Sequence, residues 1–218
     1  MDQPNLITLI IIDDHPLFRK GVRNLLSMNP RFSVVGEAAN GNEGIRLAAE
    51  TKPDLILLDI DMKGMNGIET LKLLKQDNLP SKVIMLTVSN HESNVLDALR
   101  SGADGYLLKD MEPEDILEKI EQAADGQTVI SEQLTTLLAK SIRDDHLSPH
   151  SSAEANLTNR EAEILRLVMD GMSNKVVARQ LDISDGTVKV HMKHILRKLQ
   201  LKTRVEAAIW AIKNLDDE

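Results

Sequence analysis

The chain of 218 residues contains no cysteine. This absence excludes disulfides, thiolate metal sites and a cysteine nucleophile, and it fits a reducing compartment. The apolar run from Leu6 to Ile12 has seven residues and is followed at once by acids, so it is too short to span a membrane. No basic stretch precedes it, as a secretory signal would require. We therefore expect a cytoplasmic protein that does not enter a membrane.

Aromatic residues are scarce, at 2% of the chain: Trp210, Tyr106, Phe18 and Phe32. The cores must therefore be aliphatic, and a surface that binds single-stranded nucleic acid by base stacking is disfavoured. The hydrophobic share of 42% and the charged share of 28% are ordinary for a soluble globular protein. The length favours two small domains over one.

Charge is distributed unevenly along the chain. Residues 1–155 hold 15 Lys and Arg against 25 Asp and Glu, whereas residues 156–218 hold 11 against 9, so the two parts carry charges of −10 and +2. Between Gly171 and Val205 there are eight basic residues and only two acidic ones. This local charge of +6 indicates a surface that meets phosphate groups.

Short apolar runs alternate with amphipathic stretches from Leu6 to about Gly126. The predicted strands are LITLIII, FSVVG, DLILL, KVIMLTV and GYLL. The predicted helices begin at Leu17, Asn42 and Gly67 or span Glu92–Arg100 and Pro113–Ala124. Five such repeats predict an α/β domain, a doubly wound five-stranded parallel sheet with helices on both faces.

In the rest of the chain, the spacing of apolar residues predicts only helices. A sixth helix is expected over Ser131–Arg143, followed by a polar tether, Asp144–Asn156. Four further helices are expected over Arg160–Asp170, Ser173–Leu181, Asp185–Leu199 and Thr203–Leu215. We therefore predict an α/β domain at 1–128, a helix plus flexible linker at 129–156, and a small all-α four-helix domain at 157–218.

Acidic residues follow two of the predicted strands. Asp13 and Asp14 end the first strand and Asp59 ends the third. Ligands of open parallel sheets bind beyond the carboxyl ends of the strands. If the two strands are neighbours, three carboxylates converge, which is costly unless a hard cation such as Mg²⁺ is bound. The pattern predicts a magnesium site.

Two more polar residues end the fourth and fifth predicted strands. Thr87 follows the fourth and Lys109 the fifth. A lysine ammonium can pair with a phosphoryl oxygen, and Asp59 can act as a nucleophile on an in-line phosphoryl group. Asp59, Thr87 and Lys109 are thus the candidate residues for phosphoryl transfer.

Together these residues resemble the flavodoxin-like receiver domain of two-component response regulators, from about Leu6 to Gly126. The resemblance implies that Asp59 is phosphorylated by a sensor histidine kinase, and that the chain is a phosphoacceptor with at most slow autodephosphorylation, not an enzyme. It implies Mg²⁺ ligation by Asp13, Asp14, Asp59 and Asp61, the last through its backbone carbonyl. It also implies switch roles for Thr87 and Tyr106, although a half-buried core position explains Tyr106 equally well.

Two residues depart from the receiver pattern: Lys63 stands where a Pro is frequent, and Asp61 stands where close relatives often have Asn. Our hypothesis is that the extra negative charge of Asp61 slows attack by water on the phosphoaspartate. Asp59 and Asp61 also match the D-x-D start of haloacid dehalogenase-type phosphatases, which would make the chain an enzyme. That alternative lacks the expected Thr at position 63 and leaves Asp13 and the basic helices without a role.

The predicted helix Asp185–Leu199 carries Lys189, Lys193 and Arg197 at four-residue spacing, with Val188, Ile195 and Leu199 on another stripe. A charge stripe is usually just a solvated face. However, the stretch from Leu157 to about Leu215, with L-T-x-R-E, G-x-S-N-K and T-V-K-x-H, is similar to the helix-turn-helix domain of the LuxR and FixJ class.

This second resemblance implies that Asp185–Leu199 is a recognition helix in the major groove of double-stranded DNA. Base contacts would come from Lys189, Val190 and Lys193. Phosphate contacts would come from Ser173, Asn174, Lys175, Thr187 and Lys198. The last helix would pair two protomers on an inverted-repeat operator. His191 and His194 are not expected to bind a metal.

The whole chain resembles nitrate/nitrite response regulators of the NarL and NarP kind, in the motifs VSNHE and GADGYLLKDMEPED as well as in both domains. The resemblance implies a transcription regulator that binds DNA as a homodimer, with RNA polymerase as a further candidate partner, and that responds to nitrate or nitrite through a sensor histidine kinase. Phosphorylation of Asp59 would release the DNA-binding domain. A second alternative is a receiver-like interaction protein whose basic tail binds only proteins.

Overall fold

The computed structural model describes residues 6–76, 80–88, 92–127, 129–130 and 156–215. The chain divides into two compact units, Met1–Ala124 and Asp125–Glu218, and each is described by itself. No helix in the described part of the chain is long and apolar enough to cross a membrane.

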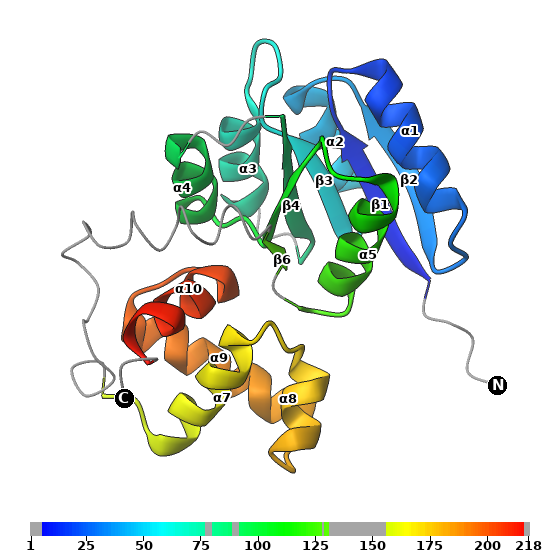
Figure 1. The fold of residues 1–218 in the computed structure, drawn as a ribbon. Coiled ribbons are helices and arrows are strands. Elements are labelled where there is room, and N and C mark those ends of the chain that lie inside the picture. Colours follow the sequence, from blue (N-terminus) through cyan, green and yellow to red (C-terminus); the bar gives the residue numbers. More distant parts are fainter. Residues whose placement is uncertain (1–5, 77–79, 89–91, 128, 131–155, 216–218) are drawn as a thin grey trace. The chain divides into compact units, whose positions relative to one another are not determined.

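The first unit is built on a parallel sheet, as predicted (Figure 1). The main strands are β1 (Ile7–Ile12), β2 (Phe32–Ala38), β3 (Leu55–Asp59), β4 (Lys82–Thr87) and β5 (Gly105–Leu108). They are ordered β2-β1-β3-β4-β5, so the direction of winding reverses between β1 and β3. That reversal is where doubly wound sheets open a crevice for ligands.

Helices cover both faces of this sheet. They are α1 (Pro16–Ser27), α2 (Gly41–Thr51), α3 (Gly67–Gln76), α4 (Glu92–Arg100) and α5 (Pro113–Ala124). Helix α1 packs against α5 on one face, whereas α2 contacts α3 and α3 contacts α4 on the other (Figure 1). The strands are buried between the two layers, which explains why β1 and β3 are almost continuously aliphatic.

A sixth strand, β6 (Val129–Ile130), follows β5 in the sheet order. The prediction of five strands is incomplete in this respect, because two residues are too short to show any periodicity. The helix predicted over Ser131–Arg143 and the tether up to position 155 lie outside the described residues.

The second unit contains four described helices, close to their predicted bounds. They are α7 (Asn159–Met169), α8 (Asn174–Gln180), α9 (Asp185–Leu199) and α10 (Arg204–Asn214). Their core is aliphatic around one indole, Trp210, which is 1% exposed. Thr158 and Glu161 form a capping box at the start of α7, and Thr203 and Glu206 form a second one at α10.

Candidate functional site

The carboxyl ends of four adjacent parallel strands are in register. Asp59 of β3 is aligned with Leu86 of β4, and Thr87 of β4 is aligned with Leu108 of β5. The amide of Lys109 donates to the Thr87 carbonyl over 2.7 Å. This register places four predicted site residues at one edge of the sheet: Asp13, Asp59, Thr87 and Lys109.

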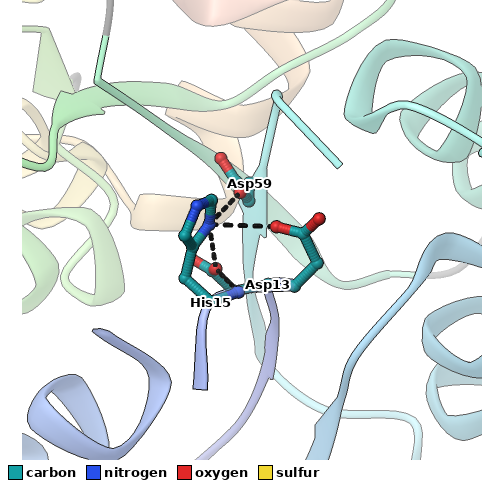
Figure 2. A group of neighbouring side chains, drawn as sticks. Asp13, His15 and Asp59 are labelled. Carbon is teal, nitrogen blue, oxygen red and sulfur yellow. Dashed lines mark hydrogen bonds and ion pairs between the residues drawn. The ribbon is translucent and has the colours of Figure 1, made fainter. Parts of the chain in front are cut away.

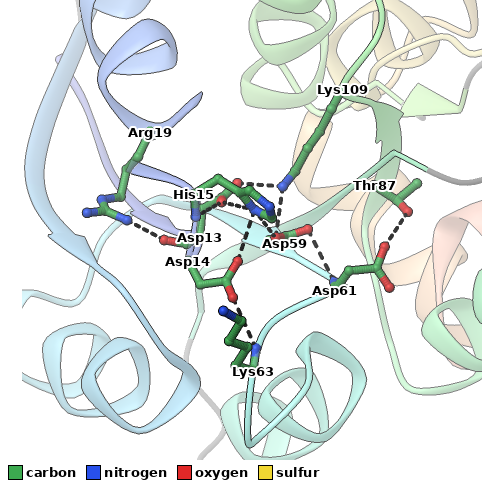
Figure 3. Close-up of polar contacts among 9 residues, drawn as sticks. All are labelled: Asp13, Asp14, His15, Arg19, Asp59, Asp61, Lys63, Thr87 and Lys109. Atoms are coloured by element: carbon green, nitrogen blue, oxygen red, sulfur yellow. Dashed lines mark hydrogen bonds and ion pairs between the residues drawn. The ribbon is translucent and has the colours of Figure 1, made fainter. Parts of the chain in front are cut away.

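The side chains at this edge meet around a single ammonium group (Figure 3). Lys109 Nζ lies 2.8 Å from Asp13 Oδ2 and 2.8 Å from Asp59 Oδ2. All three side chains are at most 6% exposed, so these charges interact with little screening. Lys109 Nζ also lies over the Phe18 ring, 4.8 Å from the ring centroid, in a cation–π contact.

Asp59, the last residue of β3, is held closely by its neighbours. Its Oδ1 accepts a hydrogen bond from the Asp61 amide over 3.2 Å. Gly67 packs directly against the backbone here, and a Cβ at that position would lie 2.0 Å from the Asp59 carbonyl oxygen. Burial raises the pKa of the Asp59 carboxyl, Lys109 lowers it, and the neighbouring Asp13 raises it further. The carboxylate is therefore more basic than an exposed aspartate, which favours a nucleophilic role.

His15 belongs to the same cluster, and our sequence analysis missed it (Figure 2). Its Nδ1 lies 2.9 Å from Asp14 Oδ1, 3.4 Å from Asp13 Oδ1 and 3.7 Å from Asp59 Oδ2. One donor atom from each of these four residues lies within 4.8 Å of the others. The only sequence signal is that His15 directly follows the acidic pair.

The buried oxygens of this cluster fit a hard cation. Asp13 Oδ2 and Asp59 Oδ2 are buried and each lies 2.8 Å from Lys109 Nζ, and the buried Asp14 Oδ1 lies 2.9 Å from His15 Nδ1. Carboxylate oxygens are the ligands that Mg²⁺ prefers in proteins. The donor set therefore suits Mg²⁺, as the sequence predicted. Asp61, the fourth predicted ligand, contributes its amide to Asp59 and has an exposed side chain.

Neighbouring residues fix the positions of the acids. Arg19 donates to the backbone carbonyl of Asp13 and is itself held by Glu37, whose Oε2 lies 3.2 Å from Arg19 Nε. The amide of Lys63 donates to Asp14 Oδ2 over 3.2 Å (Figure 3). This bond uses the backbone amide of Lys63, which a proline at this position could not donate.

The two predicted switch residues lie beside the site. Thr87 Oγ1 donates to Asp61 Oδ2 over 3.4 Å, a long hydrogen bond (Figure 3). Tyr106 is fully buried, not half-buried. Burial raises the pKa of its hydroxyl, and the neighbouring Thr87 hydroxyl opposes this shift. Asp61, Thr87 and Tyr106 thus form one polar cluster, which is joined to Asp59 through the amide of Asp61.

In the helical unit, α9 presents most of the predicted DNA-binding residues to solvent. Its inner stripe of Val188, Ile195 and Leu199 is fully buried. The exposed predicted residues are Lys175, Thr187, Lys189, Val190 and Lys193. Val190 is 54% exposed, and an exposed valine among cations is suited to an apolar contact such as a thymine methyl group.

Other residues predicted to meet DNA have partners inside the unit. Lys198 Nζ lies 2.6 Å from Glu161 Oε2 and donates to the Asn156 carbonyl over 2.8 Å. The Asn174 side chain accepts from the partly buried Arg204, whose pKa is lowered by burial to about 10. Ser173 is buried and caps α8. The contacts support positioning roles for Lys198, Asn174 and Ser173.

Comparisons with known proteins agree with both units. The family described as response regulator receiver domain matches residues 9–121, and the family described as bacterial regulatory proteins, luxR family, matches residues 155–211. The nitrate/nitrite response regulator protein NarL of Escherichia coli K12 is 54% identical over 203 residues, covering 93% of this chain and 94% of NarL. NarP of the same strain is 43% identical, covering 96% of both chains.

Solved structures give the same assignment for the first unit. The signal receiver domain of NarL from Mycobacterium tuberculosis superposes with a TM-score of 0.55 at 35% identity, covering 57% of this chain and all of that one. A receiver fold that ends in an acidic edge is thus followed by a helical unit of the LuxR type. The chain belongs to the two-component response regulators that join a receiver domain to a LuxR-type DNA-binding domain, close to the NarL and NarP regulators.

Proposed function

We propose that this response regulator accepts a phosphoryl group on Asp59 and binds double-stranded DNA in response. The phosphoacceptor role of Asp59 is supported by the position of Lys109 Nζ, 2.8 Å from both Asp13 and Asp59. A buried ammonium between a nucleophile and a cation-binding acid stabilises charge on a transferring phosphoryl group.

In the proposed reaction an Asp59 carboxylate oxygen attacks the phosphorus of the donor. The bond that breaks is the phosphorus–nitrogen bond of a phosphohistidine on a sensor histidine kinase, and the histidine leaves. Lys109 pairs with a phosphoryl oxygen, and the Thr87 hydroxyl exchanges its long bond to Asp61 for another phosphoryl oxygen. Mg²⁺, when bound by Asp13, Asp14 and Asp59, supplies further charge neutralisation.

For DNA binding we propose the exposed surface of α9 and the start of α8. Lys189, Val190 and Lys193 would contact base edges, and Lys175 and Thr187 would contact phosphates. Lys189 Nζ now lies 2.9 Å from Asp185 Oδ2, an exposed pair that a DNA contact can replace at little cost. While Lys198 is paired with Glu161, it would have a positioning role. It would contact a phosphate only if that ion pair is broken.

The remaining assignments follow from the relatives. We propose that the signal is nitrate or nitrite, that the kinase senses it, and that the protein works in the cytoplasm as a homodimer on an inverted-repeat operator, with RNA polymerase as a further partner. Residues 1–128 would receive the signal, 129–156 would connect, and 157–218 would bind DNA. Phosphorylation would free the DNA-binding unit, because a modification shifts an equilibrium by stabilising one state more than another.

The phosphoacceptor role is tested by incubating the protein with a small acyl phosphate and Mg²⁺, and measuring intact mass. The expected result is the addition of one phosphoryl group to the parent protein and none to Asp59→Asn. Equal labelling of the two proteins would reject Asp59 as the acceptor. Chelation of Mg²⁺ should slow the labelling, because the carboxylates would then repel the incoming phosphate.

The DNA-binding role is tested by gel shift on nitrate-responsive promoter DNA, with Lys189→Ala and Lys193→Ala as variants and Lys20→Ala as a control. Lys20 is exposed and lies on α1, in the receiver unit. Loss of binding in the α9 variants alone is expected, together with a steep decrease of affinity with salt as counterions are released. A tail that binds only proteins would show neither effect.

A further inference from the structure

Arg204, the first residue of α10, reaches back to the turn that precedes α8. Its guanidinium donates to the Met172 carbonyl and to Asn174 Oδ1, the second over 2.7 Å. These acceptors lie 32 and 30 positions earlier in the chain. Helix α10 packs mainly against α7, and α8 packs mainly against α9. The two hydrogen bonds of Arg204 therefore connect the start of α10 directly to the start of α8.

The turn that Arg204 holds is also fixed from within. The Met172 amide donates to the Leu167 carbonyl at the end of α7 over 3.2 Å. Ser173 Oγ accepts from the Val176 amide of α8 over 3.4 Å. These bonds leave the Met172 carbonyl without a partner from either helix end, and Arg204 supplies that partner.

The contacts of Arg204 are unusual for a partly buried cation. Both of its acceptors are neutral, and no carboxylate among the described residues pairs with the guanidinium. Burial lowers the pKa of Arg204, and its buried Nε has no hydrogen-bond partner in the part of the chain that the structure describes. Burying a charge without a counter-ion costs stability. The stability of the helical unit alone therefore does not explain an arginine at this position.

We propose that Arg204 is a positioning residue for DNA binding, which holds the turn before α8 so that the side chain of Lys175 meets a DNA phosphate. Lys175 directly follows Asn174 in the chain, and its side chain is exposed. A planar guanidinium holds two acceptors in one fixed geometry, whereas a lysine ammonium is a flexible point charge. This inference rests on the phosphate contact of Lys175 in the proposed function.

The test is the salt dependence of DNA binding by the full-length protein, treated with an acyl phosphate and Mg²⁺, on nitrate-responsive promoter DNA. Each lost phosphate contact lowers the slope of log affinity against log salt concentration by about one. We expect Lys175→Ala, Arg204→Met and the double variant each to lower the slope by about one per protomer, because both changes remove the same contact. Arg166→Met removes an exposed guanidinium of α7 and should leave the slope unchanged.

Arg204→Lys separates geometry from charge, because it keeps the charge and loses the paired hydrogen bonds. Its slope should also fall by about one per protomer, and it replaces Arg204→Met if the emission of the buried Trp210 shows that the methionine variant is unfolded. If Lys175→Ala lowers the slope and Arg204→Lys does not, the phosphate contact of the proposed function stands and Arg204 does not position it. A fall of about two per protomer in the double variant would mean that Arg204 meets a phosphate itself, which also overturns the inference. If Lys175→Ala leaves the slope unchanged, both the contact and the inference are wrong.

Discussion

Lys109 Nζ lies 2.8 Å from Asp59 Oδ2 and is bound at the same distance by Asp13. One ammonium group therefore joins the ends of β5, β3 and β1 at the reversal of the sheet. This contact gives the site its chemical character, because it holds a basic carboxylate next to the cation that will neutralise a phosphoryl group.

Replacing Lys109 by Met should impair both phosphorylation and folding. The rate of labelling by an acyl phosphate should fall by about a hundredfold, as for the loss of other charge-stabilising donors in active sites. The free energy of unfolding should fall by about 3 kcal/mol, because two buried carboxylates lose their partner. Mass spectrometry and urea denaturation followed by circular dichroism measure the two effects. Lys20→Met removes an exposed charge and should change neither.

Asp61→Asn tests the departure of this chain from its relatives. The Asp61 carboxylate accepts from Thr87 and lies next to the proposed phosphoaspartate, where its charge repels a hydroxide and orients a water with its hydrogens, not its lone pairs, toward the carboxylate. We expect the acyl phosphate of Asp61→Asn to hydrolyse faster. The half-life of the labelled protein measures this, with the exposed Asp110→Asn as a control for net charge. An unchanged or longer half-life would reject the hypothesis.

Glu161→Gln should destabilise the helical unit in a pH-dependent way. Burial alone would raise the pKa of the Glu161 carboxyl, but Lys198 and Thr158 together hold it below its ordinary value of 4.5. The folded state thus prefers the ionised form, so the stabilisation is full above that value and is lost as pH falls through the lower, folded pKa. At pH 7 the variant should lose about 2 kcal/mol, as for other hydrogen bonds to charged groups.

Fluorescence of Trp210 measures this loss in the intact protein. It is the one tryptophan of the chain and is buried in the helical core, so its emission reports the unfolding of that unit alone. Glu163→Gln changes an exposed acid on the same helix and serves as the control. The difference between parent and Glu161→Gln should shrink in acid, and a constant difference down to pH 3 would contradict the assignment.

Gly186 lies in the first turn of α9, where a Cβ would meet only Ser184 Oγ at 3.6 Å. Packing within the unit therefore does not require glycine, and Gly186→Ala should stabilise the helix by about 0.5 kcal/mol. We expect it also to weaken DNA binding, because the added methyl group would obstruct close approach of the helix start to the groove. Gly21→Ala, on the exposed surface of α1, should stabilise without affecting DNA. Equal DNA affinity of Gly186→Ala and the parent would contradict this role.

The sequence predicted the strands and helices well because the apolar periods of this chain are regular. It also predicted the acidic edge, but only on the condition that β1 and β3 are neighbours, which no single strand reveals. His15 was missed because a histidine after a strand is ordinary in loops. Its role depends on where its ring points, and that direction is set by the turn between β1 and α1.

Contacts between distant segments could not be predicted either. The ion pair of Lys198 with Glu161 joins residues 37 positions apart, so nothing in the local sequence indicated it, and the resemblance implied a phosphate contact for Lys198. By contrast, the capping box of Thr203 and Glu206 has the spacing of a known local motif, and a closer search of the sequence would have found it.

The most direct test of the account is the affinity of the full-length protein for operator DNA, measured with and without prior treatment with an acyl phosphate donor and Mg²⁺. Asp59→Asn, treated in the same way, is the control. The account predicts that treatment strengthens DNA binding by the parent protein and leaves that of Asp59→Asn unchanged. Equal affinities of the treated and untreated parent protein, at a confirmed level of phosphorylation, would contradict it.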